Sequence, residues 1–211
     1  TGGAGFIGGH LAEAFLADGL DVTVLDMMDP FYDLGIKEHT RDVHRELAAK
    51  RGVDYSFVEG DVRDADLVDE LVADADYVYH QAAQAGVRGS VENPRKYDEV
   101  NVDGTLNLLD AARKTDIERF VMASSSSVYG GREEYVPFSE TDPTLPVSPY
   151  GASKLAAERY DADAEHTHAD TTKAQALLGY DPEHTIREGV AKFIAWYREN
   201  REWYEPLVLA S

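Results

Sequence analysis

The chain has 211 residues, 43% of them hydrophobic, and a formal net charge of −20 from 40 acidic and 20 basic residues. This length and apolar content suffice for one sizeable packed domain and exclude global disorder. A surface this negative repels nucleic acid and anionic lipid, so neither is an expected partner.

Strands and helices alternate along the first part of the chain. Predicted strands cover residues 21–26, 53–61, 75–83 and 117–125, and predicted helices cover residues 11–16, 38–50, 64–72 and 94–114. This rhythm predicts an α/β fold with a doubly wound parallel sheet, in which ligands bind beyond the carboxyl ends of the strands. The glycine-rich start needs a strand to precede it, so we expect one upstream of Thr1.

The pattern changes after residue 129. Residues 130–149 contain four prolines between positions 137 and 149 and predict a loop. Further helices are predicted over residues 150–160, 172–178 and 185–200.

The first candidate site is the stretch GGAGFIG, where Gly2, Gly5 and Gly8 have the spacing G-x-x-G-x-x-G. Glycines let the backbone approach a pyrophosphate, and the start of the following helix supplies amide donors and a positive dipole. Asp26 ends the next predicted strand, where an acid can accept hydrogen bonds from ribose hydroxyls. Because such an acid repels a 2′-phosphate, the pattern favours NAD over NADP.

Three other strand ends carry candidate residues. Asp61 can meet an adenine amino group, or it can cap the helix that begins near Asp64. In HQAAQAGVRGS, small residues leave room for a flat cofactor, while His80 is interpreted as a packed strand histidine. Arg88 is a candidate anion contact, with a surface ion pair as the alternative.

Tyr150 and Lys154 form a Y-x-x-x-K pair at helical spacing, so their side chains share one face. An ammonium beside a phenol favours the phenolate, which makes the tyrosine usable as a general base. The pair follows a strand that ends in four serines, Ser124 to Ser127. A serine run at a strand end predicts part of an active site rather than a linker.

Together these residues resemble the extended short-chain dehydrogenase/reductase family. The motifs that carry the resemblance are GGAGFIG, the strand-end acid, N-x-x-G-T from Asn101 to Thr105, SSSSVYG and YGASK. Within this family the chain is similar to nucleotide-sugar 4-epimerases, and AAQAGVR followed by SVENP is most similar to UDP-glucuronate 4-epimerases. The resemblance covers residues 1–160 almost continuously and resumes near the C-terminus.

The resemblance implies NAD as the cofactor, a UDP-sugar as the substrate and no metal. Expected cofactor contacts are Gly2, Gly5, Phe6, Ile7, Gly8, Asp26, Asp61, Val62, Ala82, Ala83, Gln84, Asn101, Ser124, Tyr150 and Lys154. Expected substrate contacts are Arg88, Ser125, Ser126, Ser127 and Tyr150.

It also implies a mechanism. Tyr150, aided by Lys154, takes the proton from the sugar 4-hydroxyl while hydride moves from C4 to NAD. The 4-keto sugar turns over, and hydride returns to its other face. Ser125, four residues before the tyrosine of the VYG motif, occupies the position of the family's catalytic serine and is expected to bridge the substrate oxygen and Tyr150.

The related 4,6-dehydratases carry Asp-Glu where this chain has Ser126 and Ser127. Serine cannot act as the acid that expels water from C6, so the resemblance favours an epimerase. Glucose and glucuronate remain equal candidates for the sugar. A dehydratase, another oxidoreductase of the family that releases its cofactor, and a non-catalytic NAD-binding regulator are the alternatives.

The chain departs from the family after residue 160, where KLAAERY meets DADAEHTHAD directly. The family continues there through another strand and a small substrate domain of roughly a hundred residues. We expect residues 1–160 to form the NAD-binding domain and residues 161–211 to be the remainder of the substrate-binding region. A segment is expected to be missing between residues 160 and 161; a true deletion that leaves a cofactor-binding remnant is the alternative.

Assembly and location follow from the family and from the composition. The family commonly pairs two subunits through a four-helix bundle, so a homodimer is expected, and Leu106, Leu109 and Leu155 fit either that interface or the core. No cysteine occurs, which excludes disulfides, thiol nucleophiles and thiolate metal sites. The acidic surface predicts a salt-rich cytoplasm, with an ordinary acidic enzyme as the alternative. No apolar run approaches the ~20 residues of a membrane span.

Overall fold

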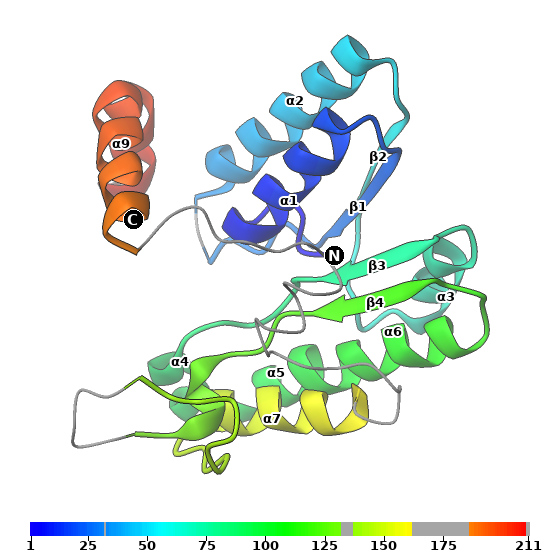
Figure 1. Cartoon of the computed structure of the whole chain (residues 1–211), viewed down its shortest axis with the longest axis vertical. Coiled ribbons are helices and arrows are strands. Elements are labelled where there is room, and N and C mark those ends of the chain that lie inside the picture. Colours follow the sequence, from blue (N-terminus) through cyan, green and yellow to red (C-terminus); the bar gives the residue numbers. More distant parts are fainter. Residues whose placement is uncertain (32, 132–136, 162–185, 210–211) are drawn as a thin grey trace.

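The computed structural model describes residues 1–31, 33–131, 137–161 and 186–209. The chain folds as alternating strands and helices. In order these are α1 (Phe6–Ala17), β1 (Val22–Asp26), α2 (Leu34–Arg51), β2 (Tyr55–Glu59), α3 (Ala65–Ala73), β3 (Tyr77–His80), α4 (Val87–Glu92), α5 (Pro94–Asp98), the π-helical turn η1 (Glu99–Asp103), α6 (Gly104–Arg113), β4 (Arg119–Met122), the 3-10 turn η2 (Ser126–Tyr129), α7 (Pro149–Asp161) and α9 (Ile186–Leu209). Helices α1 and α2 lie on one side of the strands, and α3 and α6 lie on the other (Figure 1).

The strands form two parallel pairs, β1 with β2 and β3 with β4. The first two residues of the chain connect the pairs: the Gly2 amide donates to the Leu25 carbonyl at 2.8 Å, and the Gln81 amide donates to the Thr1 carbonyl at 3.1 Å. The expected α/β architecture with parallel strands is therefore present, but in the described residues the sheet is two pairs rather than one continuous sheet. Thr1 and Gly2 lie between β1 and β3.

Local sequence sets several of the helix ends. Asp33 caps α2 by accepting from the Gly35 amide, and Asp64 caps α3 by accepting from the Leu67 amide. Gly52 ends α2 in the left-handed conformation, which glycine adopts without a steric penalty. Asp64 rather than Asp61 is thus the capping residue of α3.

The structure corrects several of the predicted helices. Residues 87–92 form α4, where a loop was expected, and the single helix expected over residues 94–114 is interrupted by the π-helical turn η1. The C-terminal helix extends to Leu209, whereas the helix predicted over residues 172–178 lies outside the described residues. Within the described part of the chain, no helix is both long enough and apolar enough to cross a membrane.

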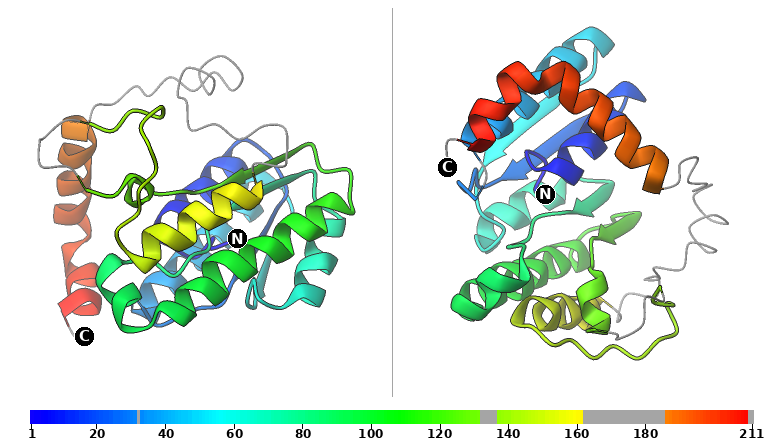
Figure 2. Two further views of the ribbon diagram at one scale, coloured as in Figure 1. Left: turned by 90° about the horizontal axis from the view of Figure 1, so that it is seen from below. Right: turned by 90° about the vertical axis from the view of Figure 1, so that its left-hand side faces the viewer.

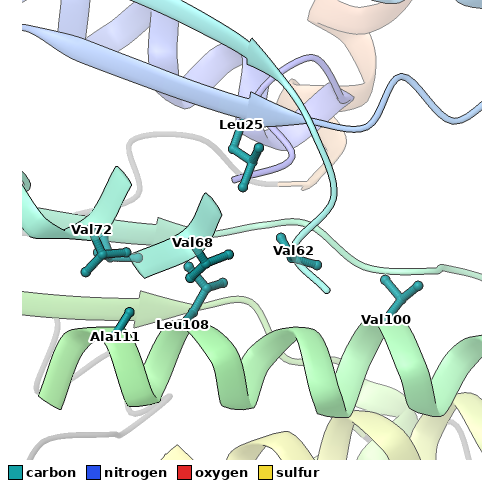
Figure 3. Packing of buried hydrophobic residues seen from close by; sticks show 8 residues of the cluster. Leu25, Val62, Val68, Val72, Val100, Leu108 and Ala111 are labelled. Atoms are coloured by element: carbon teal, nitrogen blue, oxygen red, sulfur yellow. The ribbon is translucent and has the colours of Figure 1, made fainter. Parts of the chain in front are cut away.

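The hydrophobic core lies between the strands and the helices α3 and α6 (Figure 3). Its buried members are Leu25, Val62, Val68, Val72, Val78, Val100, Leu108 and Ala111. Figure 2 shows the same layering from two further sides, with α7 lying alongside α6. This core holds the carboxyl ends of the strands in place, and those ends carry most of the candidate site.

Truncating Leu108 should destabilise the fold strongly, because its side chain is only 1% exposed and belongs to this core. We expect Leu108→Ala to lower the free energy of unfolding by about 2–5 kcal/mol, measured by urea denaturation. The matched control is Leu145→Ala, at a side chain that is 68% exposed, which should change it by about 0.5 kcal/mol or less. Equal effects of the two substitutions would contradict this placement of the core.

Candidate functional site

The glycine-rich turn is shaped by close backbone contacts. A Cβ atom at Gly8 would lie 2.3 Å from the Gly2 carbonyl oxygen, so no larger residue fits there without moving the turn. Helix α1 starts at Phe6, and its N-cap residue Gly5 provides no side-chain cap. The first-turn amides are therefore available to an anion, and the helix dipole favours negative charge at this end. The side chains of Phe6 and Ile7 are exposed beside the turn.

Asp26 ends β1 with a buried carboxylate that accepts three hydrogen bonds. Its Oδ2 accepts from the Ala4 amide at 3.1 Å, and its Oδ1 accepts from the Met28 amide and the Lys37 ammonium, both at 2.9 Å. Ala4 belongs to the glycine turn, so the carboxylate fixes that turn against the end of β1. The residue expected to bind ribose is thus held rigidly at the edge of the strands.

The pair Asp61 and Val62 follows β2. The Asp61 carboxylate accepts from the Arg63 amide at 3.0 Å and from the Arg63 guanidinium at 2.9 Å. Burial opposes the charge, but these bonds from Arg63 outweigh it and lower the pKa of Asp61. The Val62 side chain lies in the core, and its carbonyl accepts from Asn107. The cofactor contact predicted for Val62 remains a prediction.

Asn101 lies in the π-helical turn η1 and is fully buried. Its Oδ1 accepts from the Gln84 amide at 2.7 Å, and its Nδ2 donates to the Gln84 carbonyl at 3.1 Å and to Ser153 Oγ at 3.0 Å. Both amide hydrogens are therefore used within the protein. The Asn101 side chain fixes the loop that contains Gln84 to helix α7. The cofactor contact predicted for Asn101 remains a prediction.

His80 is buried at the end of β3 and makes two hydrogen bonds, to Thr1 Oγ1 at 2.7 Å and to Thr105 Oγ1 at 2.9 Å. The Thr105 hydroxyl donates to the Asn101 carbonyl, so His80 must donate to it from Nε2 and accept from Thr1 at Nδ1. Burial, with a smaller contribution from Lys154, lowers the pKa of His80 well below its usual value. The residue is a neutral structural link, as its strand position predicted.

The serine run follows β4 and enters η2. Ser125 is the N-cap of this turn, and its Oγ accepts from the Ser127 amide at 3.1 Å. This bond uses an acceptor site of the hydroxyl and leaves its proton to be donated elsewhere. Ser126 is exposed beside it, and the Ser127 carbonyl faces helix α7. The hydrogen bond from Ser127 therefore fixes the orientation of the Ser125 hydroxyl, as is needed in a group that donates a hydrogen bond during catalysis.

Helix α7 carries Tyr150 and Lys154 and is anchored at its start by Ser148. The buried Ser148 hydroxyl accepts from the Gly151 amide at 3.1 Å, and Pro149 follows it at the first helical position. A Cβ atom at Gly151 would lie 2.5 Å from the Ser127 carbonyl oxygen. The glycine between the predicted tyrosine and lysine therefore allows the helix to pack directly on the serine turn.

Tyr150 is half-buried, and the ring of Tyr97 on α5 packs edge-on against it with centroids 6.2 Å apart. The Tyr97 hydroxyl donates to the Ala85 carbonyl at 2.7 Å, which links α5 to the loop after β3. Sequence reasoning missed this residue, because an isolated tyrosine in a helix gives no signal of its neighbour.

Lys154 is only 2% exposed, and among the described residues no carboxylate lies within 4.0 Å of its ammonium. Burial lowers the pKa of Lys154 from 10.5 to about 8, and the carboxylate of Glu158 opposes this shift. A buried cation without an ion pair is unusual in a protein of charge −20. The Lys154 ammonium therefore lies at the buried end of the candidate site.

Glu158, one turn further along α7, accepts a hydrogen bond from the Ser124 hydroxyl. This bond ties the end of β4 to the helix that carries Tyr150 and Lys154. The cofactor contact predicted for Ser124 remains a prediction; in the structure its hydroxyl donates to Glu158. The sequence signal that could have identified Glu158 is its position four residues after Lys154 on the same helix.

Arg88 lies on α4 with an exposed side chain, and the described residues include no ion-pair partner for it. The surface salt bridge considered as an alternative is therefore not formed there. The substrate contact predicted for Arg88 remains a prediction.

Comparisons with known proteins show which family the chain resembles. Residues 1–162 match a family model described as GDP-mannose 4,6 dehydratase. The chain is 40% identical over 161 residues to a putative UDP-glucose 4-epimerase of Methanocaldococcus jannaschii, covering 76% of this chain and 48% of that protein. It is 41% identical over 172 residues to UDP-glucuronate 4-epimerase 1 of Arabidopsis thaliana, covering 80% and 38%. The chain thus spans half or less of the length of these two relatives.

Among solved structures, the fold is similar to a mutant of UDP-glucuronic acid 4-epimerase from Bacillus cereus, in complex with UDP-4-deoxy-4-fluoro-glucuronic acid and NAD. The TM-score is 0.68 and the sequence identity 32%, over 77% of this chain and 50% of that one.

The burial of Lys154 predicts how stability depends on pH. Its pKa is about 8 in the folded chain and 10.5 when exposed, so the unfolded chain binds more protons between these values and stability rises with pH there. Replacing Lys154 with Met removes the buried charge. The variant should gain stability over the parent at pH 7, and this gain should shrink by about 2–3 kcal/mol at pH 10.

Urea denaturation at the two pH values measures this difference. Lys114→Met serves as the control, because Lys114 pairs with Asp69 at an exposed site. Its difference from the parent should be nearly the same at both pH values. A Lys154→Met difference that does not change with pH would contradict the buried cation.

Proposed function

The chain belongs to the extended short-chain dehydrogenase/reductase family, and on this premise we propose that it inverts C4 of a UDP-sugar, either UDP-glucose or UDP-glucuronate, with NAD as cofactor. The observation that carries the proposal is the packing of the Tyr150–Lys154 helix on the Ser125 turn, at the strand edge that also holds the glycine turn and Asp26. The 4-epimerases among its relatives support the same reaction.

The residues at this edge fit a dinucleotide. The uncapped start of α1 offers amides to a pyrophosphate, and the Asp26 carboxylate offers an acceptor to a ribose. Two alanines, Ala82 and Ala83, follow β3, where a flat ring needs space. NAD, when bound, takes up the hydride from C4 of the sugar and returns it.

The chain's own residues handle the proton. Tyr150 removes the proton from the sugar 4-hydroxyl, while the Ser125 hydroxyl donates a hydrogen bond to the same oxygen. The Lys154 ammonium stabilises the negative charge that Tyr150 carries after giving up its own proton. When hydride returns to the other face of the keto sugar, Tyr150 gives the proton back. No net proton or electron is exchanged, as an epimerisation requires.

The family model carries the name of a 4,6-dehydratase, so this second reaction needs to be weighed. Loss of water from the sugar requires a group that protonates the leaving hydroxyl. The side chains after Ser125 are the hydroxyls of Ser126 and Ser127, which are poor proton donors at neutral pH. This pair supports the epimerase.

We also propose that residues 1–160 are the cofactor domain, that residues 161–211 belong to the substrate region, and that the complete protein has a further segment between residues 160 and 161. Two observations support this. The chain spans half or less of the length of the two relatives compared above, and among the described residues the buried Asp161 carboxylate has no hydrogen-bond partner for its Oδ1. Burial, together with nearby Glu158, raises the pKa of Asp161 to about 6. A buried carboxylate with an unsatisfied oxygen is unfavourable, so the surroundings of Asp161 do not match its side chain.

Mass spectrometry of the denatured protein measures the mass of a single subunit directly, without the contribution of a second copy. A subunit mass well above 23.3 kDa is expected. A mass near that value would mean that the junction is a true deletion and would overturn the proposed segment.

Two further proposals concern assembly and location. Leu106, Leu109 and Leu155 on α6 and α7 are only half-buried, which supports a homodimer that packs these helices against a second copy. The net charge of −20 supports a salt-rich cytoplasm as the working environment.

Removing the Ser125 hydroxyl should lower turnover by about a hundredfold or more while leaving NAD bound, because the hydroxyl acts on the substrate oxygen and not on the cofactor. We expect this of Ser125→Ala, assayed by nuclear magnetic resonance with UDP-glucose and UDP-glucuronate in high salt. The control is Ser56→Ala, an exposed serine on β2, which should keep full turnover.

The other outcomes are equally informative. Full turnover by Ser125→Ala would refute its catalytic role. Retention of NAD by the parent without conversion of either sugar would favour a non-catalytic regulator. A steady change in absorbance at the wavelength of reduced nicotinamide would favour net oxidation or reduction.

A further inference from the structure

The buried ion pair between Asp26 and Lys37 lies where the cofactor's adenosine ribose is proposed to bind. Lys37 Nζ is 2.9 Å from Asp26 Oδ1, and the two residues are only 8% and 6% exposed. Lys37 reaches the strand end from the first turns of α2, eleven positions along the chain. Its position depends on the packing of α2 beside α1, and the sequence analysis did not identify it.

The observed hydrogen bonds leave some donor and acceptor positions of this ion pair unused. A carboxylate has about four acceptor positions and an ammonium has three donors. Asp26 uses three of its positions, for the Ala4 amide, the Met28 amide and Lys37, and Lys37 uses one donor. About one acceptor position on Asp26 and two donors on Lys37 remain. The pair as a whole carries no net charge.

Because the Asp26–Lys37 pair has no net charge, charge repulsion alone does not explain a preference for NAD over NADP. An unpaired Asp26 would reject a 2′-phosphate by charge repulsion, which was the basis for expecting NAD over NADP. With Lys37 in contact, the carboxylate's field is largely cancelled, and the spare ammonium donors can meet an anionic oxygen. The remaining preference must then come from the fit of the ribose hydroxyls rather than from charge.

We propose that Lys37 is a selectivity-determining residue of the cofactor site, which neutralises Asp26 and so weakens the site's discrimination against a 2′-phosphorylated dinucleotide. The inference rests on the proposed dinucleotide-binding function. It concerns the ratio of two affinities, which a general loss of folding or of active protein leaves unchanged.

The test is the ratio of the dissociation constants for NADP and NAD, measured by calorimetry on nucleotide-free protein. Lys37→Met leaves the Asp26 charge without its partner, so the ratio should rise by about tenfold or more. Lys37→Arg keeps the positive charge, and its ratio should stay within about twofold of the parent's value, as should that of the remote Lys114→Met.

The opposite change gives an independent measurement, even if Lys37→Met folds poorly. Asp26→Asn leaves the Lys37 charge alone, so the ratio should fall by about tenfold or more. The double variant with both substitutions should return toward the parent's ratio. If both dinucleotides bind and neither single substitution moves the ratio, the role of Lys37 is refuted while the proposed function stands. If neither dinucleotide binds to the parent, the proposed function fails, and this inference fails with it.

Discussion

The buried side-chain amide of Asn101 is the interaction on which the arrangement of the site depends. It holds both backbone groups of Gln84 and the hydroxyl of Ser153 at once. The loop after β3, the π-helical turn and helix α7 therefore share one polar anchor. An amide in so tight a place is stabilising only if all its hydrogen bonds are made, so the three segments are fixed together or not at all.

From that anchor the rest of the candidate site follows. Ser153 holds α7 against the π-helical turn, and Gly151 lets the same helix contact the serine turn. Lys154 is carried into the interior by this packing, where burial rather than a neighbouring charge dominates the shift of its pKa. Two lysines in a strongly acidic protein thus have different surroundings: Lys37 pairs with Asp26, whereas Lys154 has no ion-pair partner among the residues that the structure describes.

Much of this could be predicted from sequence because the deciding residues are close together in the chain. The glycine turn, the acid that ends β1, and the Tyr150–Lys154 spacing each report a local conformation, and the structure has all three. The strand and helix order also follows from local periodicity.

The contacts that sequence reasoning missed all join distant segments. Lys37 meets Asp26 only because α2 packs beside α1, and Glu158 meets Ser124 only because α7 lies against the end of β4. Asn101 was recognised as part of a motif, but its partners Gln84 and Ser153 were not predicted, since a motif does not tell which partner takes up each polar atom. The burial of the Val62 side chain in the core was likewise not predicted from the sequence.

The central proposal is that, at the strand edge that carries the glycine turn, Ser125 and Tyr150, hydride leaves C4 of a sugar and returns to the opposite face of the same carbon. A UDP-sugar that carries deuterium at C4 tests this directly, with product analysed by nuclear magnetic resonance and mass spectrometry. The account predicts a product inverted at C4 that retains the deuterium at that carbon. Inversion with loss of the label to solvent, or no inversion at all, would contradict it.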